Sequence, residues 1–258
     1  MKFRAGCVQF DIKREELERN LDFVISSLEK LSEEEVKLVV LPELWAAKFD
    51  IVKAEALWDF SQVALHKVAS LSKKYGMVIV GSLIEKEGKD YFNTAYITDE
   101  SGVEIARYRK VHLFSMAGEN SYFKSGSEMV MTDSSIGKLG LIICYDLRFP
   151  ELSRRLALEG AEILVVPAQW PKARVQHWRT LALARAIENQ FFVVACNRTG
   201  LDKEEDYPGD SLIVDPWGEV LAEGGDEEGF IVAEIDLDKM KNVRQTMKCF
   251  DDRRPDLY

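Results

Sequence analysis

The sequence predicts a mixed α/β fold, in which helices cover sheets that contain both parallel and antiparallel strands. Strand–helix–strand units favour parallel pairs, because a crossover helix returns the chain to the same end of the sheet, whereas tight turns favour antiparallel hairpins. Both kinds of connection alternate along the 258 residues, and no Pro/Gly/Ser-rich linker divides them. We therefore expect one domain that spans residues 1–258.

The first half of the chain is expected to alternate strands with helices and then to form hairpins. Short apolar runs indicate strands, and apolar residues that recur every three or four positions indicate helices. Gly76 follows the second helix and is suited to end it. The turn-like segments KEGK and DESG join the later strands. The expected ranges are strand 3–10, helix 12–31, strand 36–43, helix 55–76 and strands 77–85, 90–99 and 102–114.

The second half is expected to repeat the alternation and to end in hairpins. Pro150 suits the first turn of a helix, because proline lacks the N–H that this position leaves unpaired. The segments SLIVDP and EVLAEG read as a strand pair that turns at WG. The expected ranges are strand 138–144, helix 150–160, strand 162–167, helix 174–190, strands 191–198, 211–216, 219–224 and 229–237, and a short helix from about Asp238.

Composition and charge argue against several classes of function. The net charge of −10, without a long basic run, argues against nucleic acid as a partner. The longest apolar runs are far shorter than the roughly 20 residues of a membrane span, and the N-terminus lacks the apolar core of a signal peptide. The four cysteines are scattered without CxxC spacing, which is typical of reduced thiols. We therefore expect a cytoplasmic protein with neither nucleic-acid nor membrane partners.

Polar residues stand where three of the predicted strands end. Glu43 ends the segment KLVVLPE, Lys110 ends EIARYRK, Cys144 ends GLIIC, and Glu119 lies in the loop after Lys110. Strand ends of α/β proteins collect reactive groups, because the strand fixes a side chain and the loop gives access to it. Each residue also has a plainer interpretation, since Glu43 follows Pro42 as a turn residue often does, and Lys110 suits a solvated face.

Cys144 is either a small buried hydrophobic residue or a nucleophile. Its position favours a nucleophile, because the following residues lead into the helix that Pro150 opens. Backbone N–H groups at the start of a helix would stabilise a thiolate, and they would also receive the negative oxygen of a tetrahedral intermediate. The other three cysteines are interpreted as structural or unused; they are Cys7, Cys196 and Cys249.

A thiolate also needs a partner that accepts and donates protons. Histidine is the usual candidate, and the chain has three. His66 lies within a predicted helix as a surface residue would, whereas His112 and His177 each leave a Cys–His dyad open. None of the three has metal-ligand spacing with another histidine or with a cysteine, so we expect neither a metal site nor another cofactor.

Three segments together resemble the signature segments of the nitrilase, or carbon–nitrogen hydrolase, superfamily; they are LVVLPELW, YRKVHLF and LGLIICYDLRFPEL. The resemblance implies a Glu–Lys–Cys triad of Glu43, Lys110 and Cys144, with a second glutamate at Glu119. It also implies a four-layer α-β-β-α sandwich. Family members usually form homodimers, and here helices 150–160 and 174–190 would lie at the interface.

Further segments resemble the small ω-amidase-like branch of this superfamily; they are HLFSMAGE, AQWP, HWRTLALARAIENQ, CNRTG and DDRRPDLY. The resemblance implies hydrolysis of a small carboxylate-bearing amide, such as 2-oxoglutaramate, with release of ammonia. N-carbamoyl amino acids and deaminated glutathione are alternative substrates. Arg148 stands where N-carbamoyl-amino-acid amidases have an arginine that grips the substrate carboxylate, although Leu147 replaces a preceding arginine. A salt bridge from Arg148 to Asp146 or Glu151 is the structural alternative.

The resemblance also implies the roles of the site residues. Cys144 would form a thioester, Glu43 would act as general base, and Lys110 with the backbone N–H of Tyr145 would stabilise the oxyanion. The expected pocket contains aromatic and basic side chains, namely Trp45, Phe49, Phe114, Trp170 and Arg174. A binding module of the same fold with a degenerate site is the non-enzymatic alternative.

Overall fold

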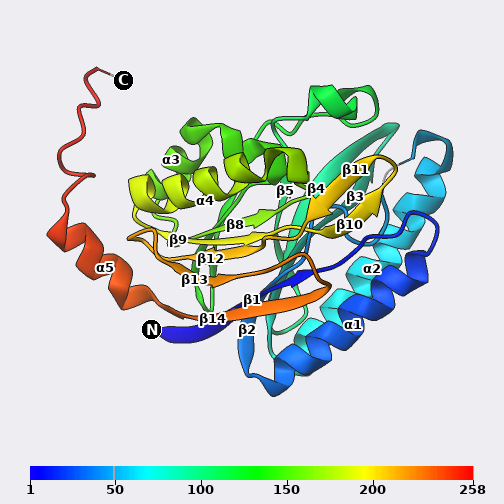
Figure 1. The fold of residues 1–258 in the computed structure, drawn as a ribbon, viewed down its shortest axis with the longest axis horizontal. Coiled ribbons are helices and arrows are strands. Elements are labelled where there is room, and N and C mark those ends of the chain that lie inside the picture. Colours follow the sequence, from blue (N-terminus) through cyan, green and yellow to red (C-terminus); the bar gives the residue numbers. More distant parts are fainter. Residues whose placement is uncertain (49, 258) are drawn as a thin grey trace.

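The structure is a computed structural model that describes residues 1–48 and 50–257. Within these residues, two six-stranded sheets face each other (Figure 1). The first sheet has the order β14–β1–β2–β3–β4–β5, and the second has the order β13–β12–β9–β8–β7–β6. Each sheet holds parallel pairs at its centre and antiparallel pairs outside them, as β1–β2–β3 and β7–β8–β9 are parallel. The prediction of mixed sheets is therefore confirmed.

The two longest strands belong to the first sheet, and no strand of the second sheet is longer than five residues. Those of the first sheet are β1 (Lys2–Gln9), β2 (Val36–Val40), β3 (Val78–Glu87), β4 (Asp90–Thr98), β5 (Glu104–Arg109) and β14 (Gly229–Asp236). Those of the second are β6 (Met131–Ser134), β7 (Gly137–Leu141), β8 (Ile163–Pro167), β9 (Phe192–Cys196), β12 (Leu212–Val214) and β13 (Val220–Glu223). A separate hairpin joins β10 (Thr199–Asp202) to β11 (Glu205–Pro208).

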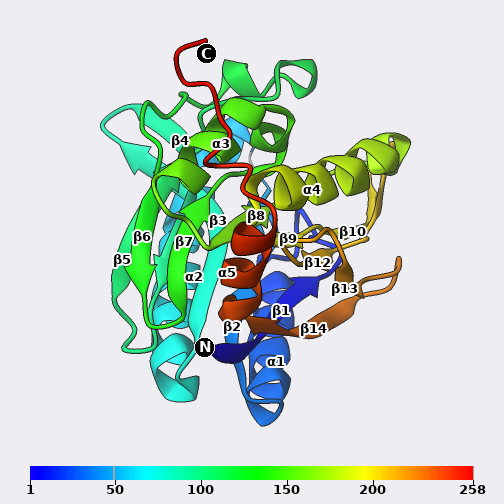
Figure 2. The same cartoon turned by 90° about the vertical axis from the view of Figure 1, so that its left-hand side faces the viewer.

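Helices cover the outer faces of both sheets. Figure 1 shows α1 (Leu17–Glu33) and α2 (Ala54–Tyr75) on one side of the sheets and α3 (Pro150–Leu158) and α4 (Val175–Asn189) on the other. The turned view in Figure 2 separates the same layers, so the arrangement is an α-β-β-α sandwich. The last helix, α5 (Leu237–Thr246), lies at one end of the sandwich. Just after it, the Met247 carbonyl accepts from Gln190 Nε2 at 2.8 Å, and Phe250 packs against the core.

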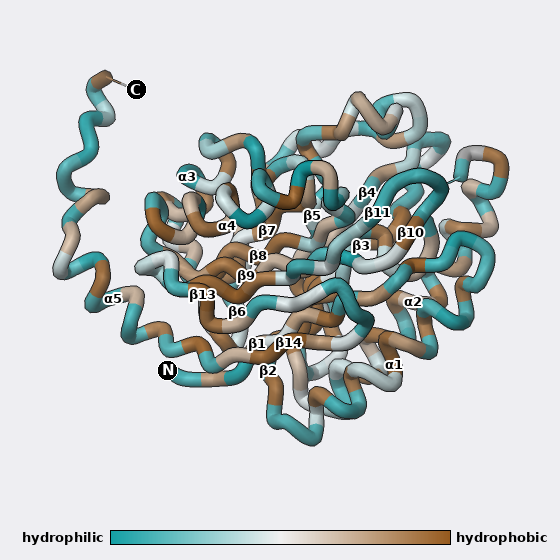
Figure 3. Tube along the Cα trace, viewed as in Figure 1, coloured by the Kyte–Doolittle hydropathy of each residue, from teal (hydrophilic) through white to brown (hydrophobic). Residues whose placement is uncertain are grey.

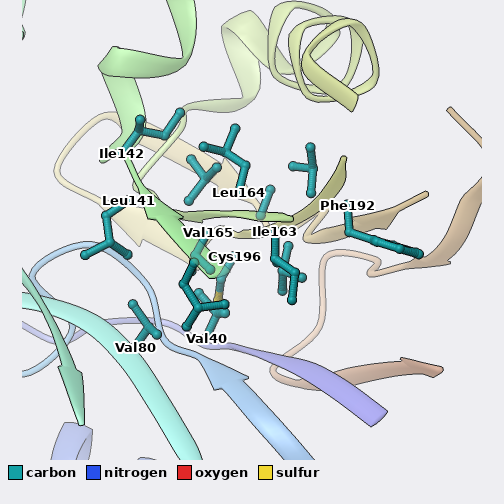
Figure 4. Packing of buried hydrophobic residues seen from close by; sticks show 14 of the residues in the cluster. Val40, Val80, Leu141, Ile142, Ile163, Leu164, Val165, Phe192 and Cys196 are labelled. Carbon is teal, nitrogen blue, oxygen red and sulfur yellow. The ribbon is translucent and has the colours of Figure 1, made fainter. Parts of the chain in front are cut away.

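The core lies between the two sheets and under the helices. Val40 and Val80 of the first sheet pack opposite Leu141, Val165 and Cys196 of the second (Figure 4), and none of these five side chains is more than 1% exposed. Figure 3 shows the hydrophobic colour concentrated along the central strands. Since burial of apolar surface stabilises a fold by roughly 25 cal/mol per Å², this layer fixes the ends of the central strands and the residues that follow them.

Most predicted elements are confirmed, with shifted ends. The predicted helix 12–31 begins later, at Leu17, and the predicted strand 138–144 ends at Leu141. Gly76 ends α2 in the left-handed conformation, with φ of 64°. Three strands were not predicted, β6, β10 and β11, because they are four residues long and largely polar. Edge strands and isolated hairpins of this kind lack the apolar runs that indicate a buried strand.

Candidate active site

Glu43, Lys110 and Glu119 form a buried ionic cluster between the two sheets. The Lys110 ammonium lies 2.7 Å from Glu43 Oε1 and 2.8 Å from Glu119 Oε2, and only 2% of this side chain is exposed. Glu119 also accepts a hydrogen bond from the Phe114 N–H at 2.7 Å. Residues from three separate segments therefore meet at one point, as the sequence predicted.

The charge of Lys110 is stabilised by its neighbours. Burial alone would lower the pKa of this ammonium, but the carboxylates of Glu43 and Glu119 outweigh burial and raise the pKa above its ordinary value. Lys110 is thus a fixed positive charge at a buried position. Such a charge stabilises a negative oxygen more strongly than an exposed lysine would.

Asn93 belongs to the same cluster, and the sequence analysis missed it. Its side-chain Nδ2 donates to Glu43 Oε1 at 2.7 Å and to Glu119 Oε1 at 3.1 Å. Asn93 lies within β4 and is completely buried, and its backbone carbonyl accepts from the Lys110 N–H at 2.9 Å. Its Oδ1 is buried without a hydrogen-bond partner in the described part of the chain. A polar residue in the middle of the apolar run YFNTAYI is the signal that would have found it.

Cys144 opens a short 3₁₀ turn, Cys144–Arg148, three residues after the last residue of β7. Its φ is +45°, a left-handed conformation that costs a residue other than glycine about 1–2 kcal/mol. Strain of this kind is found at functional sites, where the surrounding structure enforces it. The Cys144 Sγ donates to the Gln169 carbonyl at 3.7 Å, and 8% of the residue is exposed.

The environment of Cys144 corrects one expectation. We expected the N–H groups of a following helix to stabilise the thiolate, but α3 begins six residues later at Pro150. Burial and the charge of Glu43 raise the pKa of the Cys144 thiol well above its usual value, although Lys110 opposes this shift. A thiol with a raised pKa is protonated at neutral pH, and such a thiol becomes a nucleophile only after a base takes its proton.

Asp146 holds the turn that carries Cys144. This completely buried carboxylate accepts hydrogen bonds from the Ile143 N–H at 2.9 Å and the Tyr108 hydroxyl at 2.8 Å. It also accepts from the backbone N–H of His112 at 2.9 Å and lies 2.8 Å from His112 Nδ1. His112 is thus tied to Asp146, and its ring stacks on Phe149 with the ring centres 3.6 Å apart.

The structure does not support a Cys–His dyad. His112 Nδ1 is bound to Asp146, and His177 Nδ1 lies 3.3 Å from a guanidinium nitrogen of Arg148. Neither histidine lines the pocket that contains Cys144, and within the described residues no hydrogen bond joins either of them to the thiol. His66 is exposed on α2, as expected.

A pocket opens above Cys144. Its empty space, counted out to open solvent, is about 250 Å³. The predicted substrate-binding residues Phe114, Arg148 and Trp170 line it, and so do Arg174, Tyr145, Gln169 and Pro171. The Arg148 guanidinium lies over the Trp170 ring at 4.6 Å. Among the residues that the structure describes, Arg148 has no acidic partner, so the alternative of a salt bridge to Asp146 or Glu151 is wrong.

Two residues expected around the pocket have a different outcome. Trp45 is only 1% exposed and packs in the hydrophobic cluster under α1 and α2, so it supports the core rather than the pocket. Phe49 lies outside the described residues.

In the part of the chain that the structure describes, no group of three His, Cys, Asp or Glu side chains is arranged to hold a metal ion. No described helix is long and apolar enough to cross a membrane.

Comparison with known proteins gives the class of hydrolase to which this two-sheet sandwich belongs. The chain belongs to the carbon–nitrogen hydrolase family, whose model matches residues 4–245. It is therefore an enzyme that hydrolyses carbon–nitrogen bonds.

Individual relatives are similar over most of the chain. The 2-oxoglutaramate amidase of Bacillus subtilis is 43% identical, with all of both chains covered. The deaminated glutathione amidase of Synechocystis is 44% identical over 64% of this chain and 65% of its own length. The crystal structure of a carbon–nitrogen hydrolase from Helicobacter pylori G27 superposes with a TM-score of 0.95 at 29% identity, and covers 100% of this chain and 97% of its own.

Proposed function

We propose that the enzyme hydrolyses the terminal amide of a short 2-oxo acid, such as 2-oxoglutaramate, and releases ammonia. The observation that carries this proposal is the pocket, which contains both the thiol of Cys144 and the guanidinium of Arg148. A guanidinium without an acidic partner is suited to bind a substrate carboxylate through two parallel hydrogen bonds. Full-length similarity to the 2-oxoglutaramate amidase of Bacillus subtilis supports the same substrate.

In the proposed mechanism Cys144 attacks the amide carbonyl and forms a thioester. Glu43 accepts the thiol proton and delivers it to the amide nitrogen, so that ammonia leaves as the C–N bond breaks. Water then attacks the thioester with Glu43 again as the base, which releases the acid and restores the thiol. The raised pKa of Cys144 supports this order, because a neutral thiol needs a base at the moment of attack.

Lys110 and the backbone N–H of Tyr145 stabilise the negative oxygen of each tetrahedral intermediate in this mechanism. Loss of one such donor typically costs about 10²–10³ in turnover. Glu119 acts by holding the ammonium, since both of its oxygens lie within 3.1 Å of Lys110 Nζ. Lys110 also assists the protonation of the departing ammonia.

The pocket supports a small substrate. Phe114 and Trp170 offer flat walls for a short carbon chain. Deaminated glutathione is larger, but it is the second candidate because a relative with that activity is 44% identical over its matched region. N-carbamoyl amino acids are the third.

An ammonia-release assay with these three substrate classes tests the proposal. We expect 2-oxoglutaramate to have a kcat/KM at least about 10-fold above the others, and Arg148→Met to lower its kcat/KM by about 10–100-fold, which corresponds to one charged hydrogen bond of 1.5–3 kcal/mol. Cys144→Ala and Glu43→Gln should abolish turnover. A preference for deaminated glutathione would contradict the substrate assignment and leave the amidase chemistry intact.

We also propose a homodimer whose interface contains α3 and α4. Leu158 at the end of α3 is 40% exposed, and Ile187 on α4 is 51% exposed. The two helices lie side by side on one outer face in both views (Figures 1 and 2), so a second copy could cover both apolar side chains.

The four cysteines are free thiols, which supports a reducing compartment such as the cytoplasm.

A further inference from the structure

Gln169 contacts the proposed base and the proposed nucleophile at the same time. Its backbone N–H donates to Glu43 Oε2 at 3.0 Å, and its side-chain Nε2 donates to the backbone carbonyl of Glu43 at 2.7 Å. Its own backbone carbonyl accepts from Cys144 Sγ at 3.7 Å. Gln169 therefore holds both the Cys144 thiol, which gives up the proton, and the Glu43 carboxylate, which accepts it.

The fourth polar group of Gln169 faces a buried arginine. Its side-chain Oε1 accepts from Arg198 Nη1 at 3.3 Å. Gln169 and Arg198 meet because β8 and β9 are parallel neighbours with Pro167 opposite Cys196, and each residue lies two positions beyond that pair. Both side chains thus emerge at the same end of the second sheet.

Arg198 is held rigidly and is completely buried. Its Nη2 donates to Asp11 Oδ1 at 2.8 Å and to the Ile12 carbonyl at 3.0 Å, and its Nε donates to the Thr199 carbonyl at 3.1 Å. Its guanidinium also lies 4.5 Å from the centre of the Tyr207 ring. A buried cation is costly unless it is paired and fully hydrogen-bonded, and these contacts come from β10, β11 and the segment after β1.

Arg198 determines which way the Gln169 amide points. A guanidinium can only donate hydrogen bonds, so the oxygen of the amide must face it. The NH₂ group must then face the Glu43 carbonyl, which can only accept. Without Arg198, the Glu43 carbonyl would be the only group among these contacts that orients the amide, and the amide oxygen would lose its hydrogen bond.

We propose that Arg198 is a positioning residue of the amidase reaction and acts on Glu43 and Cys144 through the Gln169 side chain. The inference rests on the roles proposed above for Glu43 and Cys144. Misplacement of a catalytic group by about 1 Å costs as much as 10²-fold in rate. If Gln169 no longer holds the backbone of Glu43, the Glu43 carboxylate should therefore take the thiol proton more slowly. Arg198 does not line the pocket, and its effect should therefore fall on kcat rather than KM.

A double-mutant cycle tests this relay with 2-oxoglutaramate as substrate. Arg198→Met and Gln169→Met should each lower kcat by about 10–100-fold. The kcat of the double variant should lie within about 3-fold of the kcat of the less active single variant, because both changes break the same chain of contacts from Arg198 through Gln169 to Glu43. For Arg198→Met, KM should stay within about 3-fold of the wild-type value. If Arg198→Met does not fold, Arg198→Lys replaces it in the cycle, because lysine keeps the charge beside Asp11 but lacks the planar fork.

Arg244→Met is the matched control. Arg244 also stacks on an aromatic ring, with its guanidinium 4.7 Å from the centre of Phe250, but it lies on α5 and contacts none of the site residues. We expect its kcat to equal that of the wild type. Additive losses in the cycle, or a wild-type kcat in folded Arg198→Met or Arg198→Lys, would overturn the relay. Retained turnover in Cys144→Ala would instead overturn the proposed nucleophile, so the two failures are distinguishable.

Discussion

At the scale of single residues, Glu43 and Glu119 share one ammonium but differ in their other contacts. Glu43 Oε1 accepts hydrogen bonds from Lys110 and Asn93, and Glu43 Oε2 accepts one from the Gln169 N–H. The carbonyl of the same Gln169 accepts from the Cys144 thiol. Glu119 accepts from the Phe114 N–H instead. A base that serves Cys144 must lie on the Cys144 side of the lysine, and the contact with Gln169 favours Glu43 as the proposed base.

Asn93 donates to both carboxylates through one nitrogen and so helps to hold them beside Lys110. We expect Asn93→Ala to lower kcat by about 10-fold or more, because Glu43 and Glu119 each lose a donor worth 1.5–3 kcal/mol and Lys110 must hold them alone. Asn93→Asp should be more damaging, since it places a third carboxylate in the cluster. Steady-state kinetics measure both effects. Asn93→Asp with higher activity than Asn93→Ala would contradict this account.

The raised pKa of the Cys144 thiol makes stability depend on pH. An acid whose folded pKa is raised stabilises the fold below its unfolded pKa, near 8.5 for a thiol, and that stabilisation is lost as the pH rises. Between pH 7 and pH 10 we therefore expect the free energy of unfolding of the wild type to fall by about 2 kcal/mol relative to Cys144→Ala. Urea unfolding of both proteins at the two pH values measures the difference. If the difference in the free energy of unfolding between the two proteins were the same at both pH values, the pKa of the Cys144 thiol would not be raised in the folded protein.

At the scale of elements, the end of β5 is fixed by a close backbone contact. A Cβ on Gly126 would lie 2.1 Å from the Arg109 carbonyl oxygen, and the Gly126 N–H donates to the Lys110 carbonyl at 2.8 Å. Because the obstructing atom is backbone, no side-chain rotation relieves the clash. The glycine thus allows the segment after Glu119 to return beside the strand that carries Lys110.

We expect Gly126→Ala to cost about 1–3 kcal/mol in the free energy of unfolding, as overpacking does, and to lower kcat because Lys110 moves. Gly225→Ala is the matched control, since its Cβ would meet nothing within 4 Å. Urea unfolding and ammonia release measure the two effects. Equal stability of both variants would show that the segment can move aside without disturbing Lys110.

Elements also determine what the sequence can predict. Glu43 and Cys144 were predicted because each ends a strongly apolar run, Lys110 was predicted because it ends an expected strand, and three motifs in the expected order joined them. Asn93, Gln169 and Arg198 were missed because their roles depend on which strands pair. Asn93 reads as one polar residue in a strand until β4 pairs with β5 and brings it beside Lys110. Arg198 reads as a surface cation until the β10–β11 hairpin covers it.

At the scale of the whole molecule, the two outer helical faces differ in how their apolar residues can be used. On α4 and α3, Ile187 and Leu158 are exposed on the face that we propose for the dimer. On the opposite side α2 exposes Val63, of which 57% is accessible. Single exposed apolar residues are common on protein surfaces, so exposure alone does not choose between the two faces.

Charge substitutions on the two faces test the proposed dimer. Ile187→Glu should produce monomers, because a carboxylate buried in an apolar interface without a partner costs several kcal/mol. Val63→Glu, on the opposite face, should leave the dimer intact. Light scattering coupled to size-exclusion chromatography gives the mass of each species over a range of concentrations. A dimeric Ile187→Glu variant, or a monomeric Val63→Glu variant, would place the interface elsewhere. Since the turn Cys144–Arg148 leads directly into α3 at Pro150, a monomeric variant should also lose part of its kcat.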